Sequence, residues 1–100
     1  MSLRFRVDRL ANDDLRAAYH CYDDQRQGLG EEFADDVARV FERICEFPDS
    51  FEVVEHDVRV AALSRLPYLA LFRTGEAGIV VLAVYHQRRD PKLWSSRLSH

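Results

Sequence analysis

The chain has 100 residues and a mass of 11.7 kDa, which suits one small domain and excludes a second hydrophobic core. Hydrophobic residues make up 47% of the chain and charged residues 31%, a composition that excludes both a disordered tail and a membrane protein. There are 14 basic and 17 acidic residues, and the resulting net charge of -3 argues against attachment to nucleic acid by bulk positive charge. The sequence therefore predicts a single soluble domain over residues 1–100.

Charge is distributed unevenly between the two halves of the chain. Residues 1–50 hold seven arginines against twelve acidic residues, whereas residues 51–100 hold six arginines and Lys92 against five acidic residues. Arginine dominates the basic residues, and its flat guanidinium suits paired contacts with carboxylates and phosphates. The second half is thus the expected docking region for an acidic partner.

The cysteines and the N-terminal segment bear on the cellular compartment. Cys21 and Cys45 lie in no metal-binding spacing, so we expect them to be reduced and packed inside an intracellular protein. Residues 1–10 lack the apolar run of a signal peptide, and the longest apolar run, Ile79–Tyr85, is too short to cross a membrane. These observations predict a cytoplasmic protein without membrane contact.

A strand and two helices are predicted over the first half of the chain. Residues 3–7 alternate between apolar and polar side chains, the pattern of a half-buried strand. A first helix is expected to begin at Asn12 or Asp13 and to end at the Gly-Leu-Gly linker of residues 28–30, and a second to run from that linker to Pro48. Both helices carry an apolar stripe, so they predict an antiparallel helical hairpin that needs a sheet to cover.

Four further strands are predicted in the second half: Phe51–Glu55, Val58–Leu63, Tyr68–Arg73 and Ile79–His86. The last of them is apolar almost throughout, which is typical of a central strand covered on both faces. Residues 74–78 are expected to form a turn, Asp90-Pro91 to end the sheet, and Lys92–Leu98 to form a short helix or tail. The predicted fold class is α+β, with an N-terminal strand, an antiparallel two-helix hairpin and a mainly antiparallel strand meander.

Most templates for enzyme chemistry are absent from the sequence. There is no glycine-rich phosphate loop, metal-ligand cluster or nucleophile elbow, so we expect neither a metal nor a cofactor. What remains is a group of cationic and aromatic residues in the second half: Arg59, Arg65, Arg73, Tyr85, His86, Arg88, Arg89, Trp94 and Arg97.

This group has two interpretations, and the residues alone leave both open. In the first it is an RNA-cleaving site, because attack by a 2′-hydroxyl needs a base, an acid and cations for the charged phosphate. His86 would serve as acid or base, and Arg59 and Arg73 would clamp the phosphate if they share its face. In the second, the arginines are solvated surface residues in weak ion pairs, and Trp94 anchors the tail by packing.

Four segments, in order along the chain, carry a resemblance to a known family: Gly28–Phe33, Val58-Arg59, Leu66–Arg73, and Ala83–Pro91 running on to Trp94 and Arg97. From Phe5 to Arg97 the chain resembles the RelE/ParE superfamily of type II toxin–antitoxin toxins, in particular its ParE-like, plasmid-stabilisation branch. The resemblance implies a compact toxin that is neutralised by an antitoxin encoded beside it. The complex would repress its own operon, so operator DNA would be contacted only through the antitoxin.

The resemblance implies two alternative targets. RelE-like members cleave mRNA in the ribosomal A site, whereas ParE-like members poison DNA gyrase and are not known to need a nuclease site. This chain has Lys92 as its single lysine, lacks the paired lysines of the nuclease members, and is acidic where ribosome-dependent toxins tend to be basic. We therefore expect a gyrase-inhibiting toxin that is not an enzyme. A ribosome-dependent mRNA endoribonuclease is the alternative, and an inactive, antitoxin-binding member is the second alternative.

The resemblance also assigns roles to individual residues. Arg59 matches the family's strand arginine, Arg73 can be matched to another, and His86 matches the histidine of the His-x-Arg-Arg-Asp-Pro element. These three residues would be catalytic only in a nuclease. Binding to the antitoxin or the target is expected of a second set: Arg65, Arg88, Arg89, Trp94 and Arg97.

Overall fold

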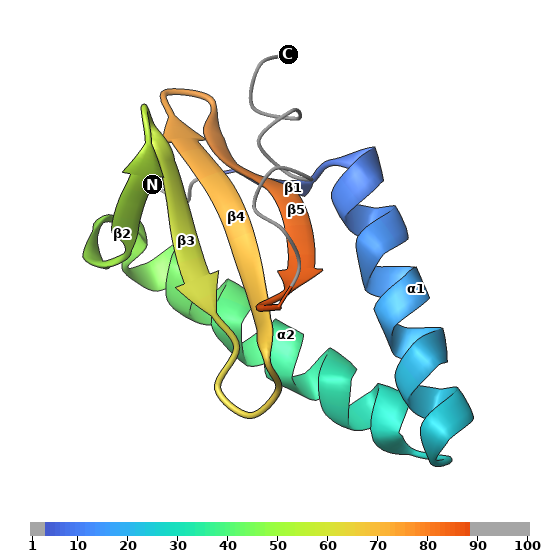
Figure 1. Ribbon diagram of the computed structural model, residues 1–100. Coiled ribbons are helices and arrows are strands. Elements are labelled where there is room, and N and C mark those ends of the chain that lie inside the picture. Colours follow the sequence, from blue (N-terminus) through green and yellow to red (C-terminus); the bar gives the residue numbers. More distant parts are fainter. Residues whose placement is uncertain (1–3, 89–100) are drawn as a thin grey trace.

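The computed structural model describes residues 4–88, in which a strand and two helices precede a four-strand meander (Figure 1). The elements are β1 (Phe5–Val7), α1 (Arg9–Gln25), α2 (Leu29–Glu46), the short 3-10 helix η1 (Pro48–Ser50), β2 (Glu52–Glu55), β3 (Val58–Ala62), β4 (Tyr68–Gly75) and β5 (Gly78–His86). The predicted α+β class and element order are confirmed. The expected helix or tail at Lys92–Leu98 lies outside the described residues, as do Arg89, Trp94 and Arg97.

The strands form one mixed sheet in the order β1-β5-β4-β3-β2. β1 runs parallel to β5, and every other neighbouring pair is antiparallel, as the predicted meander requires. β1 covers only the first part of β5, from Ile79 to Val81. Gly78 permits this close approach, because its φ of 123° favours glycine and a Cβ atom there would collide with the backbone of Arg4.

The two helices pack on one face of the sheet, with α2 crossing behind the strands and α1 beside β5 (Figure 1). The main core lies between helices and sheet, and its largest members are Phe33, Val40, Ile44, Phe72, Ile79 and Val81. A smaller cluster on the opposite face consists of Val58, Leu71 and Ala83. Since β5 contributes buried residues to both clusters, the prediction of a central strand covered on both faces is confirmed.

Helix α1 begins earlier than the polar residues Asn12 and Asp13 predict. The N–H of Asp8 donates to the Val81 carbonyl at 2.9 Å, and its own carbonyl accepts the N–H of Asn12 at 2.9 Å. The chain therefore turns from the edge of the sheet directly into the helix, and Ala11 in the first turn is completely buried. Packing of this turn against the sheet thus overrides the local capping signal.

Two other expectations about the helices need correction. Gly28 adopts the left-handed conformation with φ of 93°, but it precedes α2 as its N-cap, because α1 has already ended at Gln25. Cys21 and Cys45 are free thiols, yet both are exposed, so the prediction that they pack in the interior is wrong. Neither α1 nor α2, the two α-helices of the described residues, is long and apolar enough to cross a membrane.

Candidate functional site

Asp36 organises the loop between β3 and β4 from inside the core. Among the side chains of residues 4–88, Asp36 is the one charged group that is completely buried. Its Oδ1 accepts the N–H of Ser64 at 3.0 Å, and its Oδ2 accepts the N–H groups of Arg65 at 2.8 Å and Leu66 at 3.0 Å. Three charge-assisted bonds compensate for the burial of the carboxylate. They also hold the loop that carries the exposed Arg65 side chain.

Four rings gather at the same end of the sheet, one from each of α1, α2, β4 and β5. The ring of Tyr68 lies 5.3 Å from Phe33, 5.9 Å from Tyr22 and 5.3 Å from His86, which is its partner in the strand register. Burial raises the pKa of the Tyr22 phenol, so this group is neutral at physiological pH. The four rings form a packed cluster at the end of β5.

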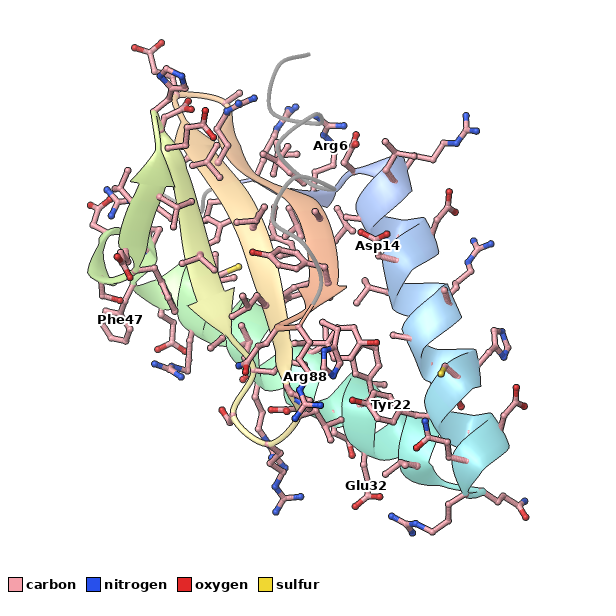
Figure 2. All side chains as sticks on the ribbon, viewed as in Figure 1. Arg6, Asp14, Tyr22, Glu32, Phe47 and Arg88 are labelled. Atoms are coloured by element: carbon pink, nitrogen blue, oxygen red, sulfur yellow. The ribbon has the colours of Figure 1, made fainter. Side chains whose placement is uncertain are left out.

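Arg88 follows His86 at this end of the sheet. The backbone N–H of Arg88 donates to Nδ1 of His86 at 3.0 Å, and the N–H of Gln87 donates to the Pro67 carbonyl at 2.9 Å. The end of β5 is therefore tied to the β3–β4 loop. The side chains of Arg65 and Arg88 are exposed, and no ion pair within residues 4–88 involves either of them. Figure 2 shows Arg88 at this end of the molecule, on the side where Tyr22 lies.

Arg59 is engaged elsewhere. Its guanidinium donates to the backbone carbonyls of Phe51 at 2.7 Å and Asp49 at 3.3 Å, and it lies 3.7 Å from the Asp49 carboxylate. These contacts pin η1 and the start of β2 to β3. Arg59 thus acts as a clamp within the fold, and its hydrogen bonds direct it away from His86.

Arg73 is also remote from His86. Its Nε donates at 3.0 Å to Oδ1 of Asp57, which lies in the turn between β2 and β3. In the β4–β5 register Arg73 stands opposite Val80, whereas Tyr68 stands opposite His86. Five residues of extended strand separate these two positions, a distance of about 17 Å. Side-chain alternation also places Arg73 with Leu71, on the sheet face that the helices do not cover.

The structure therefore brings together only part of the predicted site. His86, Arg65 and Arg88 lie at one end of the sheet, whereas Arg59 and Arg73 do not join them. Sequence reasoning missed Asp36, although a carboxylate inside the apolar stripe of α2 is a signal that could have found it. Within the described residues, no group of three His, Cys, Asp or Glu side chains is arranged to hold a metal ion.

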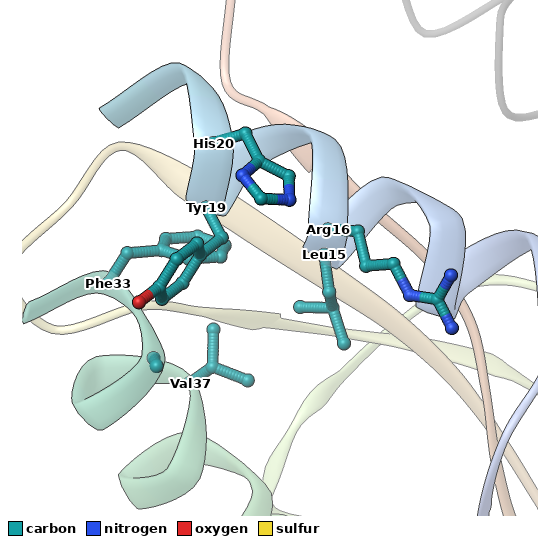
Figure 3. A pocket seen from close by; sticks show the side chains of 7 residues that line it. Leu15, Arg16, Tyr19, His20, Phe33 and Val37 are labelled. Atoms are coloured by element: carbon teal, nitrogen blue, oxygen red, sulfur yellow. The ribbon is translucent and has the colours of Figure 1, made fainter. Parts of the chain in front are cut away.

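A second feature is a solvent-open groove between α1 and α2, shown in Figure 3. It has a volume of about 340 Å³. Most of its lining side chains are apolar or aromatic: Leu15, Tyr19, Phe33, Ala34 and Val37. Arg16 and His20 of α1 add two basic side chains. The Tyr19 hydroxyl donates to Oε1 of Glu31 at 2.6 Å, which links the two helices beside the groove. The groove suits an amphipathic segment whose acidic residues face the α1 side.

Comparison with known proteins agrees with this architecture. No curated protein matches the sequence. Of the solved structures, one described as "Chromosomal ParDE TA system from P. aeruginosa" is similar with a TM-score of 0.75 and 20% sequence identity, over 85% of this chain and 96% of that chain. Residues 5–91 match the family described as "ParE toxin of type II toxin-antitoxin system, parDE". Because the match spans nearly the whole chain and the fold agrees with it, the protein belongs to the ParE toxin family of type II toxin–antitoxin systems.

Proposed function

We propose that this ParE-family toxin inhibits growth by poisoning DNA gyrase in the cytoplasm, without a nuclease site of its own. The observation that supports this proposal is the separation of Arg59 and Arg73 from His86, together with the ion pairs that occupy both arginines. A ribonuclease that used these three residues would need its base and its phosphate-binding cations around one scissile bond. A toxin that inhibits a protein target needs only a complementary surface.

The end of β5 offers such a surface. Arg65 and Arg88 are exposed there, and the backbone of both residues is held by hydrogen bonds to Asp36 and His86. Arginine is enriched at protein interfaces, and an anchor that is held in place before binding loses less entropy when the complex forms. We therefore assign target contact to these two residues.

We further propose that the antitoxin covers the groove between α1 and α2 and continues to the end of β5. An apolar stripe of the antitoxin would fill the groove, and its acidic residues would face Arg16, Arg65 and Arg88. Neutralisation would then follow from direct masking of the two target-binding arginines. Contact with operator DNA would be made through the antitoxin, because the toxin itself carries a net charge of -3.

A ribosome-dependent endoribonuclease is the second candidate, and one observation favours it. The ring of His86 lies 5.3 Å from that of Tyr68, and the exposed Arg65 and Arg88 belong to the segments at the same end of the sheet. Rings of this kind stack on unpaired bases of single-stranded RNA. In this version Arg65 and Arg88 take the phosphate-binding role that the sequence assigned to Arg59 and Arg73.

Inducible expression with separate readouts of DNA supercoiling and translation tests the proposal. We expect replication to stop with an SOS response, and the purified toxin to stabilise gyrase–DNA cleavage complexes. The double variant Arg65→Ala, Arg88→Ala should weaken this effect about tenfold, because truncation of an arginine at the centre of an interface has an effect of this size. The control Arg39→Ala, at an exposed position of α2, should leave the effect unchanged. His86→Ala, which removes the hydrogen bond that holds the backbone of Arg88, should weaken the effect less than the double arginine replacement does.

Three outcomes distinguish the candidates. Arrest of translation with gyrase unaffected, abolished by His86→Ala, would overturn the proposal in favour of the endoribonuclease. Growth without inhibition, with antitoxin binding retained, would identify an inactive member. A gyrase effect that needs His86 but neither Arg65 nor Arg88 would refute the assignment of the contact surface.

A further inference from the structure

β2 is the outer strand of the sheet on the side away from α1. It pairs with β3 alone, and no other strand of the described residues lies along its second edge. All four of its residues, Glu52–Glu55, are exposed. An outer strand of this kind offers unpaired N–H and C=O groups to a further strand.

Apolar side chains gather at this edge. Among the described residues the exposed large hydrophobic side chains are Leu10, Phe47, Val53 and Val54, and all except Leu10 belong to β2 or to the residue that joins α2 to η1. Phe47 is 62% exposed, and Figure 2 shows it projecting outward near β2. Phenylalanine and valine exposed together on a small domain mark a surface that a partner covers.

The edge is held in position before any partner binds. Besides the clamp from Arg59 to the carbonyls of Asp49 and Phe51, the ring of Phe51 packs edge-on against Phe72 at 5.6 Å. The guanidinium of Arg43 covers the same Phe51 ring at 5.6 Å. A preformed edge loses little conformational entropy when a strand is added to it.

Charge determines which kind of strand fits. Glu52 and Glu55 flank the two valines of β2. Glu55 lies 3.9 Å from Nε2 of the neighbouring His56, and no arginine or lysine within residues 4–88 forms an ion pair with either glutamate. A second copy of β2 would oppose glutamate to glutamate, and an acidic antitoxin segment would be repelled as well. A strand with basic residues between apolar ones places opposite charges together instead.

We propose that the β2 edge is a second docking surface, which binds an extended protein segment of alternating basic and apolar residues by strand addition. The main-chain groups of β2 would supply hydrogen bonds, and Phe47, Val53 and Val54 would supply the apolar contacts. The bulge between Val53 and Glu55 limits the length of regular pairing, so the segment is short. This surface is separate from the groove and from the end of β5. The β2 edge can therefore bind its segment while the antitoxin or the target occupies the other surfaces.

The test uses the full chain and two capped synthetic peptides at low ionic strength. In one peptide lysine and arginine alternate with valine, and in the other glutamate replaces every basic residue. We expect the basic peptide to shift the amide NMR signals of Glu52–Glu55 and to bind at least about tenfold more tightly than the acidic one. Glu52→Lys with Glu55→Lys should remove this preference, whereas Phe47→Ser should weaken binding of the basic peptide with no change in fold.

The matched control is the double variant Asp35→Lys, Glu42→Lys, at two exposed positions of α2. It changes the net charge by the same amount as the double replacement on β2. This variant should bind the basic peptide as the parent protein does. Equal binding of both peptides, or signal shifts confined to α1 and α2, would overturn the proposal. Self-association through β2, detected as concentration-dependent shifts of the same signals without peptide, would replace it with a contact between two copies.

Discussion

At the scale of single residues, Asp36 shows how one buried charge determines the position of an exposed one. Its carboxylate accepts three backbone N–H groups, and Arg65 is carried by the loop that these bonds hold. A buried carboxylate without partners would be strongly unfavourable, so the loop and Asp36 stabilise each other.

Replacement of Asp36 is therefore expected to destabilise the fold far more than replacement of its exposed neighbour. Asp36→Ala leaves three backbone donors without their acceptor, and we expect the free energy of unfolding to fall by about 3 kcal/mol. Asp35→Ala, as the control, should change it by less than about 0.5 kcal/mol. Urea-induced unfolding measures both values, and equal stability of the two variants would contradict the role of Asp36.

At the scale of elements, the apolar stripes of α1 and α2 pack on the sheet and are covered there only in part. Leu15, Phe33 and Val37 contribute to the main core and also line the groove that opens to solvent between the two helices. The hydrogen bond from Tyr19 to Glu31 links the helices beside this groove. A substitution that fills the groove therefore tests whether a partner binds there.

Ala34→Glu is expected to abolish protection by the antitoxin while toxicity remains. The new side chain would place a charge in the apolar groove, and we expect the dissociation constant of the cognate antitoxin to rise at least about tenfold. Ala38→Glu, on the exposed side of the same helix, is the matched control and should leave it unchanged. Growth under co-expression and calorimetry with the purified pair provide the measurements. Full protection of cells that express Ala34→Glu would place the antitoxin elsewhere.

At the scale of the whole molecule, three tyrosines link stability to alkaline pH. The hydrogen bond to Glu31 raises the pKa of Tyr19 above its ordinary value of 10.0, and burial raises the pKa of Tyr22 and of Tyr85. The folded protein therefore holds these phenolic protons more tightly than the unfolded chain does. By linkage, the stability that they confer is complete below about pH 10 and is lost as the pH rises through their folded pKa values.

We accordingly expect the free energy of unfolding to fall as the pH rises above about 10, whereas these phenols cause no pH dependence of stability near neutral pH. Tyr22→Phe and Tyr85→Phe should each reduce the slope, because each removes one phenol that titrates differently in the two states. Urea unfolding at several pH values measures this slope. A slope that is identical in the parent and both variants would show that these phenols are not the cause.

The elements and their order can be predicted from the pattern of residues along the chain. Apolar stripes at helical spacing predicted both helices, and the run from Ile79 to Val84 predicted a strand buried on both faces, because periodicity of apolar residues reports directly which sides of an element meet the core. The sequence also carried the resemblance to the toxin family, since the motifs are local in the chain.

Which side chains meet cannot be predicted in this way, because it depends on the folded chain. Arg59, Arg73 and His86 all lie on strands, and their separation follows from strand register, from alternation of faces and from the carboxylates of Asp49 and Asp57. The same holds for Asp36, which meets a loop 28 to 30 positions later in the chain. Local patterns specify how a segment is built, but register and long-range packing specify where its side chains point, and those arise only when the whole sheet and its helices assemble.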